Sequence, residues 1–111
     1  MNPGLTIDEV RGAIAERRTT AAALAEEFYT RIKQEDSEIG AFLTLSNERA
    51  MAKAAQVDKL AAAGDPLPPL AGVPVAIKDV MVTRGVRSTA GSKIIENFIP
   101  PYDCTDRKSV V

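Results

Sequence analysis

The 111-residue sequence contains no histidine, no tryptophan and a single cysteine, Cys104. Without an imidazole the chain cannot build a Ser-His-Asp or Cys-His nucleophile. Any hydrolase chemistry in it therefore needs a lysine, a carboxylate or a metal-bound hydroxide as the base. One cysteine cannot form an internal disulfide, and with no histidine beside it the usual zinc ligand sets are excluded. We therefore expect no metal site, and we interpret Cys104 as an ordinary thiol.

The sequence also lacks an excess of charge and a long apolar run. Its 14 Lys and Arg residues balance 15 Asp and Glu residues, so it has no electrostatic footprint for nucleic acid or an anionic membrane. No apolar run approaches the ~20 residues of a membrane span. Asp8 and Glu9 lie where a targeting peptide would be basic or poor in acids. We expect a cytoplasmic globular chain, either one small domain or a piece of a larger one.

Residues 1–65 are predicted to be an N-terminal helical segment. Thr6 and Glu9 have the spacing of a capping box, which starts a helix. The Arg17-Arg18 pair suits the end of that helix, where exposed carbonyls favour cations.

A second helix is predicted to begin at Thr19 or Thr20 and to break between Ser37 and Gly40. Its apolar stripe has a helical period and consists of Ala21, Leu24, Ala25, Phe28 and Ile32. A third helix follows, capped by Ser46 or Asn47 and closed by Gly64 in the left-handed conformation that often ends helices. Its face is formed by Ala50, Met51, Ala54, Val57 and Ala61.

Two segments rich in β-formers predict strands, at 41–45 (AFLTL) and at 73–80 (VPVAIKDV). Between them, 65–72 holds three prolines and a glycine, which predicts an extended connector. The Ser/Thr/Gly-rich segment 83–92 is expected to be a loop, followed by a short helix at 93–97 that Ser92 caps and Pro100-Pro101 ends. Residues 66–105 thus form the second predicted part of the chain.

Lys78 is the residue that most invites a chemical role. It lies in an apolar run, where a charged ammonium must pair, reach water or lose its proton. A lysine that loses its proton is a usable base near neutral pH. The plainer alternative is a lysine at the end of an edge strand that reaches solvent, and the residues alone favour it. Loop 83–92 could bind an oxyanion through its backbone amides or supply a hydroxyl nucleophile. The residues alone favour an ordinary surface turn, and neither glycine-rich phosphate motif is present.

The segment 70–79 (LAGVPVAIKD) resembles the start of the amidase signature family. The resemblance continues through Thr83-x-Gly85, then 88–92 (STAGS), then 100–103 (PPYD), and covers about residues 5–105. It implies an α/β fold in which a mixed sheet is sandwiched by helices, with a helical N-terminal part. Within the family, 92–103 is most similar to the A subunits of glutamyl-tRNA(Gln)/aspartyl-tRNA(Asn) amidotransferases.

The resemblance implies that Lys78 is the base of a Ser–cis-Ser–Lys triad, which needs no histidine. It also implies a glutamine amidase that releases ammonia to partner subunits B and C, which amidate mischarged tRNA with ATP and Mg²⁺. No cofactor is expected in this chain itself. Aryl acylamidases, fatty-acid amide hydrolases and allophanate hydrolases share the first block, so another small amide is an alternative substrate.

Two departures from the family pattern limit what the resemblance implies. The two serines of the triad lie well downstream in the family, so Ser88 and Ser92 do not take their roles, and we expect the chain to be an inactive N-terminal fragment. Residues 106–111 (DRKSVV) do not continue the family pattern. One reverse translation, GAT CGG AAG AGC GTC GTG, reads like a sequencing adapter, so we expect this tail to be non-native. The alternative is a real gene that a frameshift truncates.

An interpretation from a different class is a short, non-catalytic helical module. It would bind a partner through the Leu24 and Phe28 face or through the alanine-rich third helix. A stable, soluble and cooperatively folding monomer would favour this alternative. A fragment would instead expose an uncovered apolar strand edge, which is a template for association.

Overall fold

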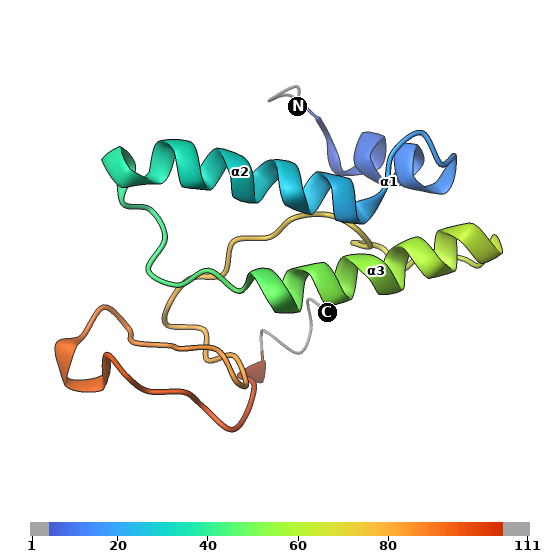
Figure 1. Cartoon of the computed structure of the whole chain (residues 1–111). Helices are drawn as coiled ribbons and strands as arrows, with labels where there is room; N and C mark the ends of the chain where they lie inside the picture. The colour runs from blue at the N-terminus through green and yellow to red at the C-terminus, as the bar shows by residue number, and fades with distance from the viewer. Residues whose placement is uncertain (1–4, 106–111) are drawn as a thin grey trace. The chain divides into compact units, whose positions relative to one another are not determined.

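The structure, a computed structural model, describes residues 5–105. It contains three α-helices, α1 (Ile7–Ala15), α2 (Ala21–Ile39) and α3 (Asn47–Ala63), and one 3₁₀ turn, η1 (Lys93–Ile95), as Figure 1 shows. The described residues form two compact units. The first comprises 5–41 and 46–74 and holds the three helices, and the second comprises 42–45 and 75–105. The tail predicted to be non-native, 106–111, lies outside the described residues.

The helix starts follow the predicted capping residues. The capping box of α1 is confirmed: the Thr6 hydroxyl accepts the Glu9 N–H at 3.2 Å, and the Glu9 carboxylate accepts the Thr6 N–H at 2.7 Å. The backbone and side-chain hydrogen bonds from Thr6 lower the pKa of Glu9. Thr20 caps α2 by accepting the Ala23 N–H at 3.0 Å. Ser46 occupies the cap position of α3.

The helix ends differ in part from the prediction. Gly64 closes α3 with a φ of 74°, as predicted. Helix α2 runs through Ser37 and ends only at Gly40, which has a φ of 66°. At the end of α1, Arg17 adopts a φ of 58°. Its N–H bonds the Ile14 carbonyl at 3.0 Å and the Arg18 N–H bonds the Ala13 carbonyl at 2.9 Å, which together form a Schellman motif.

A small apolar core joins the three helices of the first unit. Helix α2 packs along α3, and α1 also contacts α3 (Figure 1). Alanine is frequent in this core, which lets helix backbones approach closely. The buried residues are Val10, Ile14, Ala21, Leu24 and Ala54, and the half-buried ones packed against them include Ala25, Val57, Ala61, Leu67 and Val73.

A carboxylate on α3 completes the capping of α2. Asp58 accepts the N–H groups of Ala21 and Ala22 at 2.7 and 3.1 Å. These are two of the amides that the first turn of a helix leaves without a partner in the helix. The positive end of the α2 dipole favours the negative charge there. Asp58 thus links the two helices by polar bonds as well as by packing.

The connector predicted at 65–72 packs against this core. Gly72 has a φ of 76°, and a Cβ atom at this position would lie 2.2 Å from Cδ1 of the buried Ile14 and 3.4 Å from Cβ of Ala21. Only glycine fits both the conformation and the space. This close approach fixes where the chain leaves the first unit.

Neither predicted strand forms within residues 5–105. The segments 41–45 and 73–80 contain no β-bridge, so the prediction of a strand at each was wrong. A strand exists only when its backbone groups pair with a neighbour, and the described residues supply none. The mixed sheet of the predicted α/β fold is therefore absent from the described residues, which are helical. The helix predicted at 93–97 is also shorter, a 3₁₀ turn that Ser92 caps through the Ile94 N–H at 3.2 Å.

Candidate functional site

Lys78 lies at the first position of a turn in the second unit. The Met81 N–H donates to the Lys78 carbonyl at 2.9 Å, which closes the turn between these residues. The Lys78 side chain is exposed. In this chain the ammonium reaches water, so no apolar burial has to be compensated. The role predicted for Lys78 as a base stays a prediction.

Asp79, the next residue, holds loop 83–92 against the Lys78 turn. Its carboxylate accepts the Thr89 N–H at 2.9 Å, the Gly91 N–H at 3.1 Å and the Thr89 hydroxyl. Its backbone carbonyl accepts the Ala90 N–H at 3.2 Å. Three consecutive loop residues are therefore bonded to the residue that follows Lys78.

These bonds favour the charged form of Asp79. The hydroxyl of Thr89 has the largest effect in lowering the pKa of the carboxyl, followed by the Thr89 amide, and the Gly91 amide and the Arg87 guanidinium act in the same direction. Asp79 is therefore a carboxylate at neutral pH, and its acceptor oxygens face the loop.

The loop contributes three buried polar residues to the second unit. Thr89 is 3% exposed, and Thr83 and Ser88 are also buried. The Ser88 hydroxyl donates to the Val86 carbonyl at 3.0 Å, and the Ser92 hydroxyl caps η1. Ser88 and Ser92, which were not expected to act as nucleophiles, are thus both engaged in local structure.

The segment 98–104 holds the other side of the loop. The Gly85 N–H donates to the Pro100 carbonyl at 2.9 Å, and the Ser88 N–H donates to the Phe98 carbonyl at 3.0 Å. Asp103 accepts the Arg84 N–H at 2.7 Å. Asp103 and Asp79 are therefore two carboxylates that anchor the same loop at different points. The half-buried Cys104 bonds through its backbone, its N–H donating to the Val82 carbonyl.

Sequence reasoning assigned no role to Asp79. The signal was present, since a Lys-Asp pair precedes a Ser/Thr/Gly segment and a carboxylate is a strong acceptor for exposed loop amides. The partner could not be inferred in the same way, because Asp79 and Thr89 are ten residues apart and no local rule pairs them.

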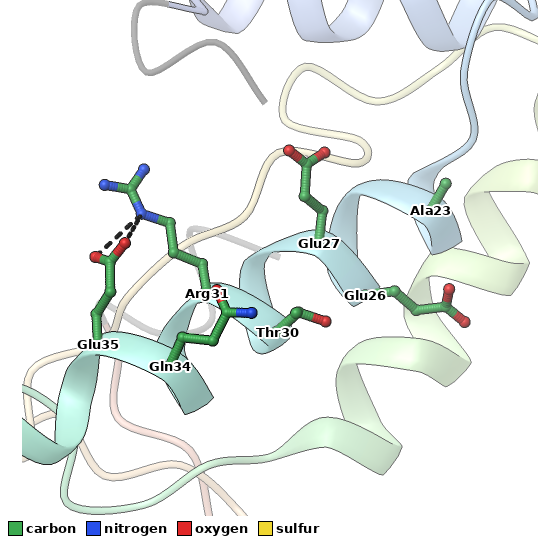
Figure 2. A pocket seen from close by; sticks show the side chains of 7 residues that line it. All are labelled: Ala23, Glu26, Glu27, Thr30, Arg31, Gln34 and Glu35. Atoms are coloured by element: carbon green, nitrogen blue, oxygen red, sulfur yellow. Dashed lines mark hydrogen bonds and ion pairs between the residues drawn. The ribbon is translucent and has the colours of Figure 1, made fainter.

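A shallow hollow lies elsewhere, on the exposed face of α2. Figure 2 shows that its lining residues all come from this one helix: Ala23, Glu26, Glu27, Thr30, Arg31, Gln34 and Glu35. The Arg31 guanidinium pairs with Glu35 at 3.1 Å, one helical turn away. None of the predicted site residues lines this hollow, and an exposed ion pair on a helix surface is ordinary solvated structure.

Metal sites and membrane spans are two further possibilities for the described part of the chain. Residues 5–105 contain no group of three or more His, Cys, Asp or Glu side chains placed to hold a metal ion. Among the helices that the structure describes, none is both long enough and apolar enough to cross a membrane.

The sequence matches a known protein family. The Amidase family profile matches residues 23–108, which is most of the chain. The chain belongs to the amidase family.

The curated relatives refine this assignment. The chain is 63% identical over 101 residues to the A subunit of the glutamyl-tRNA(Gln) amidotransferase of Koribacter versatilis, a match that covers 91% of this chain and 21% of that one. It is 52% identical over 97 residues to the corresponding protein of Chlamydia abortus, covering 87% and 20%. The chain thus spans about a fifth of the length of these relatives.

Solved structures support the same fold. Two of them come from a vestigial protein complex described as revealing the evolutionary origins of an s-triazine catabolic enzyme. They superpose with TM-scores of 0.84 and, for the inhibitor-bound complex, 0.83, at 38% sequence identity. In both, the match covers 89% of this chain and 22% of the other chain. The part that matches this chain is therefore a small share of a larger chain in these neighbours.

Proposed function

We propose that this chain is the lysine-bearing N-terminal part of the glutamine-hydrolysing subunit of a tRNA-dependent amidotransferase. The 63% identity to the Koribacter versatilis protein carries the proposal. The match of the Amidase family profile to residues 23–108, which include Lys78, supports it. The larger fold in this proposal is the predicted α/β one, whose mixed sheet is sandwiched by helices and formed with segments outside residues 5–105.

In the proposed reaction Lys78 acts as the base. Its neutral amine takes a proton from a bridging serine, which takes the proton of the nucleophilic serine as that oxygen attacks the side-chain amide carbon of glutamine. The C–N bond breaks, and the relayed proton leaves with the nitrogen as ammonia. Water then hydrolyses the acyl-enzyme to glutamate and frees the serine. Both serines come from outside residues 5–105 in this proposal.

The partners and cofactors follow from the same proposal. Subunits B and C would receive the ammonia and amidate mischarged Glu-tRNA(Gln) or Asp-tRNA(Asn). The ATP and Mg²⁺ used there fit poorly on this chain, because residues 5–105 group no three metal-ligating side chains and the sequence has no phosphate-binding glycine motif. The proposal therefore places them in the complex but outside residues 5–105.

The test uses a chimera in which this segment replaces the matching residues of the Koribacter versatilis protein, assembled with that organism's partner subunits. Lys78→Ala is expected to lower glutamine hydrolysis by about 10⁴-fold or more, because the members of such a catalytic unit fail together. Lys78→Arg should fail similarly, since a guanidinium stays protonated. Lys93→Ala, on an exposed lysine of the same unit, is the matched control and should leave activity unchanged.

Ammonia release by Lys78→Ala at the rate of the unsubstituted chimera would exclude Lys78 as the base. The 111-residue chain alone is expected to release no ammonia from glutamine, because it lacks the two serines. Turnover by this chain that Lys78→Ala abolishes would overturn that expectation.

A second candidate is an amidase that acts on a small amide other than glutamine. The 38% identity to chains of the complex linked to an s-triazine catabolic enzyme favours it. The same lysine chemistry would serve, because Lys78 acts on the serines rather than on the substrate side chain. Release of ammonia from small amides but not from glutamine, by a family-length protein that carries this segment, would decide for this candidate.

A further inference from the structure

We propose that Asp79 is a positioning residue for Lys78, a role that rests on the proposed function. Its carboxylate holds the loop segment 89–91 to the turn that carries Lys78. It thereby fixes the backbone position from which the Lys78 side chain extends. The Asp79 carboxylate itself takes no part in proton transfer.

Hydrogen bonds between the turn and the loop are concentrated at Asp79. Asp79 accepts four hydrogen bonds, three on its carboxylate and one on its backbone carbonyl, all from Thr89, Ala90 and Gly91. The carbonyl of Lys78 is engaged by the Met81 N–H. These hydrogen bonds therefore fix the backbone that follows the Lys78 Cα atom. The four-carbon side chain of Lys78 thus extends from a backbone position that is fixed.

The Asp79 carboxylate is directed at the loop. An ion pair with a carboxylate would favour the charged form of a lysine. The hydrogen bonds described for the Asp79 carboxylate go instead to Thr89 and Gly91. Its negative charge is thus committed to the loop, and Lys78 is left for another partner.

Polar residues make up most of the buried side chains in this part of the chain. Within 42–45 and 75–105 the buried residues are Thr83, Ser88, Thr89 and Pro100. A segment with this composition is ordered by hydrogen bonds and not by a hydrophobic core. In this part of the chain the Asp79–Thr89 contact joins the most buried polar residue to the Lys78 turn.

The experiment compares Asp79→Asn with Asp103→Asn in the chimera described above. Both substitutions remove the charge of a carboxylate that accepts a loop amide, but only Asp79 adjoins Lys78. Asp79→Asn is expected to lower kcat by about 10- to 100-fold with KM unchanged, because a displacement of about 1 Å has effects of this size. Asp103→Asn should leave kcat close to that of the unsubstituted chimera.

Substitutions at Thr89 test the contact from its other side. Thr89→Val keeps the shape and removes the hydroxyl donor, so it should lower kcat as Asp79→Asn does, while Thr89→Ser keeps the donor and should retain activity. The kcat of the double variant Asp79→Asn with Thr89→Val should be no lower than that of Asp79→Asn alone, because both substitutions break the same contact. Equal losses for Asp79→Asn and Asp103→Asn, or a loss that appears in KM alone, would overturn the positioning role.

A measurement on the 111-residue chain needs no activity. Hydrogen exchange at the amides of Thr89 and Gly91 should accelerate in Asp79→Asn and stay unchanged in Asp103→Asn. Unchanged protection of these two amides in Asp79→Asn would show that the Asp79 carboxylate does not hold the loop.

Failure of the proposed function has a different signature, since Lys78→Ala would then stay active in the chimera. An inactive Lys78→Ala beside a fully active Asp79→Asn would instead overturn the positioning role alone.

Discussion

Arg17 has the left-handed backbone conformation that glycine usually adopts at the end of a helix. It follows the last turn of α1 with a φ of 58°, and its N–H and that of Arg18 complete a Schellman motif. For a residue with a side chain, this conformation costs roughly 1–2 kcal/mol. Arg17 and Arg18 were predicted at the helix end from their charge. The charge pattern does not indicate the backbone conformation, and the positive φ makes this position unfavourable for Arg17.

Arg17→Gly is therefore expected to stabilise the chain. The relief of the left-handed conformation exceeds the extra freedom that glycine has in the unfolded chain, for a net gain of about 0.5–1 kcal/mol. Urea unfolding of the dilute chain, followed by helical circular dichroism, measures the change in the midpoint. Arg18→Gly is the matched control, since the positive φ is at Arg17 alone of the two, and it should not raise the midpoint. A lower midpoint for Arg17→Gly would contradict the argument.

The elements of the chain fall into those that local signals predict and those that they do not. The capping box at Thr6, the cap at Thr20 and the stop at Gly64 were predicted because each depends on residues within one helical turn. The bonds from Asp58 to Ala21 and Ala22 join residues 37 and 36 positions apart, which no local pattern indicates. The bond between Asp79 and Thr89 joins residues ten positions apart, and no local pattern indicates it either.

The two wrong strand predictions have a different cause. The segments 41–45 and 73–80 have β-branched and apolar residues, and these report a preference for extended, buried surroundings. Whether such a segment becomes a strand depends on a neighbour to pair with. The described residues give it none, so Lys78 lies at a turn instead of on a strand.

The order of loop 83–92 is expected to depend on pH. The bonds from Thr89 and Gly91 lower the pKa of Asp79 below the value it has in the unfolded chain. A depressed folded-state pKa stabilises the ordered loop above about pH 4 and loses that effect as pH falls through the folded-state value. The Thr89 and Gly91 amide resonances should therefore titrate together, with a midpoint below about 4.

Asp79→Asn supplies the control for this titration, because an amide does not ionise in this range. In that variant the two amide resonances should be independent of pH between neutrality and about pH 3. A midpoint above the ordinary value for aspartate in the unsubstituted chain would mean that the bonds favour the neutral carboxyl, contrary to the geometry of the loop.

The whole molecule divides its apolar residues unequally. The helices of the first unit enclose a core that includes Ile14 and Leu24. In its described residues the second unit buries no large aliphatic or aromatic side chain, and it exposes many: Phe42, Leu43, Leu45, Val75, Ile77, Val80, Ile94, Ile95, Phe98, Ile99 and Tyr102. Exposed apolar residues gathered on one segment mark a surface that another part of a protein covers. In the proposed family-length protein, the rest of the chain would cover it.

The 111-residue chain by itself is therefore expected to associate. At tens of micromolar it should elute and sediment as a mixture larger than a monomer, because the exposed residues bury apolar area only by contacting another copy. Ile94 is 94% exposed and Ile99 is 61% exposed, so Ile94→Lys with Ile99→Lys should restore the monomer without a loss of helix content. Leu24→Lys is the contrasting variant, since Leu24 is buried in the first unit and a charge there should unfold the helices. A monodisperse and cooperatively unfolding monomer of the unsubstituted chain would instead favour the self-contained helical module, because such a chain has no apolar surface left to cover.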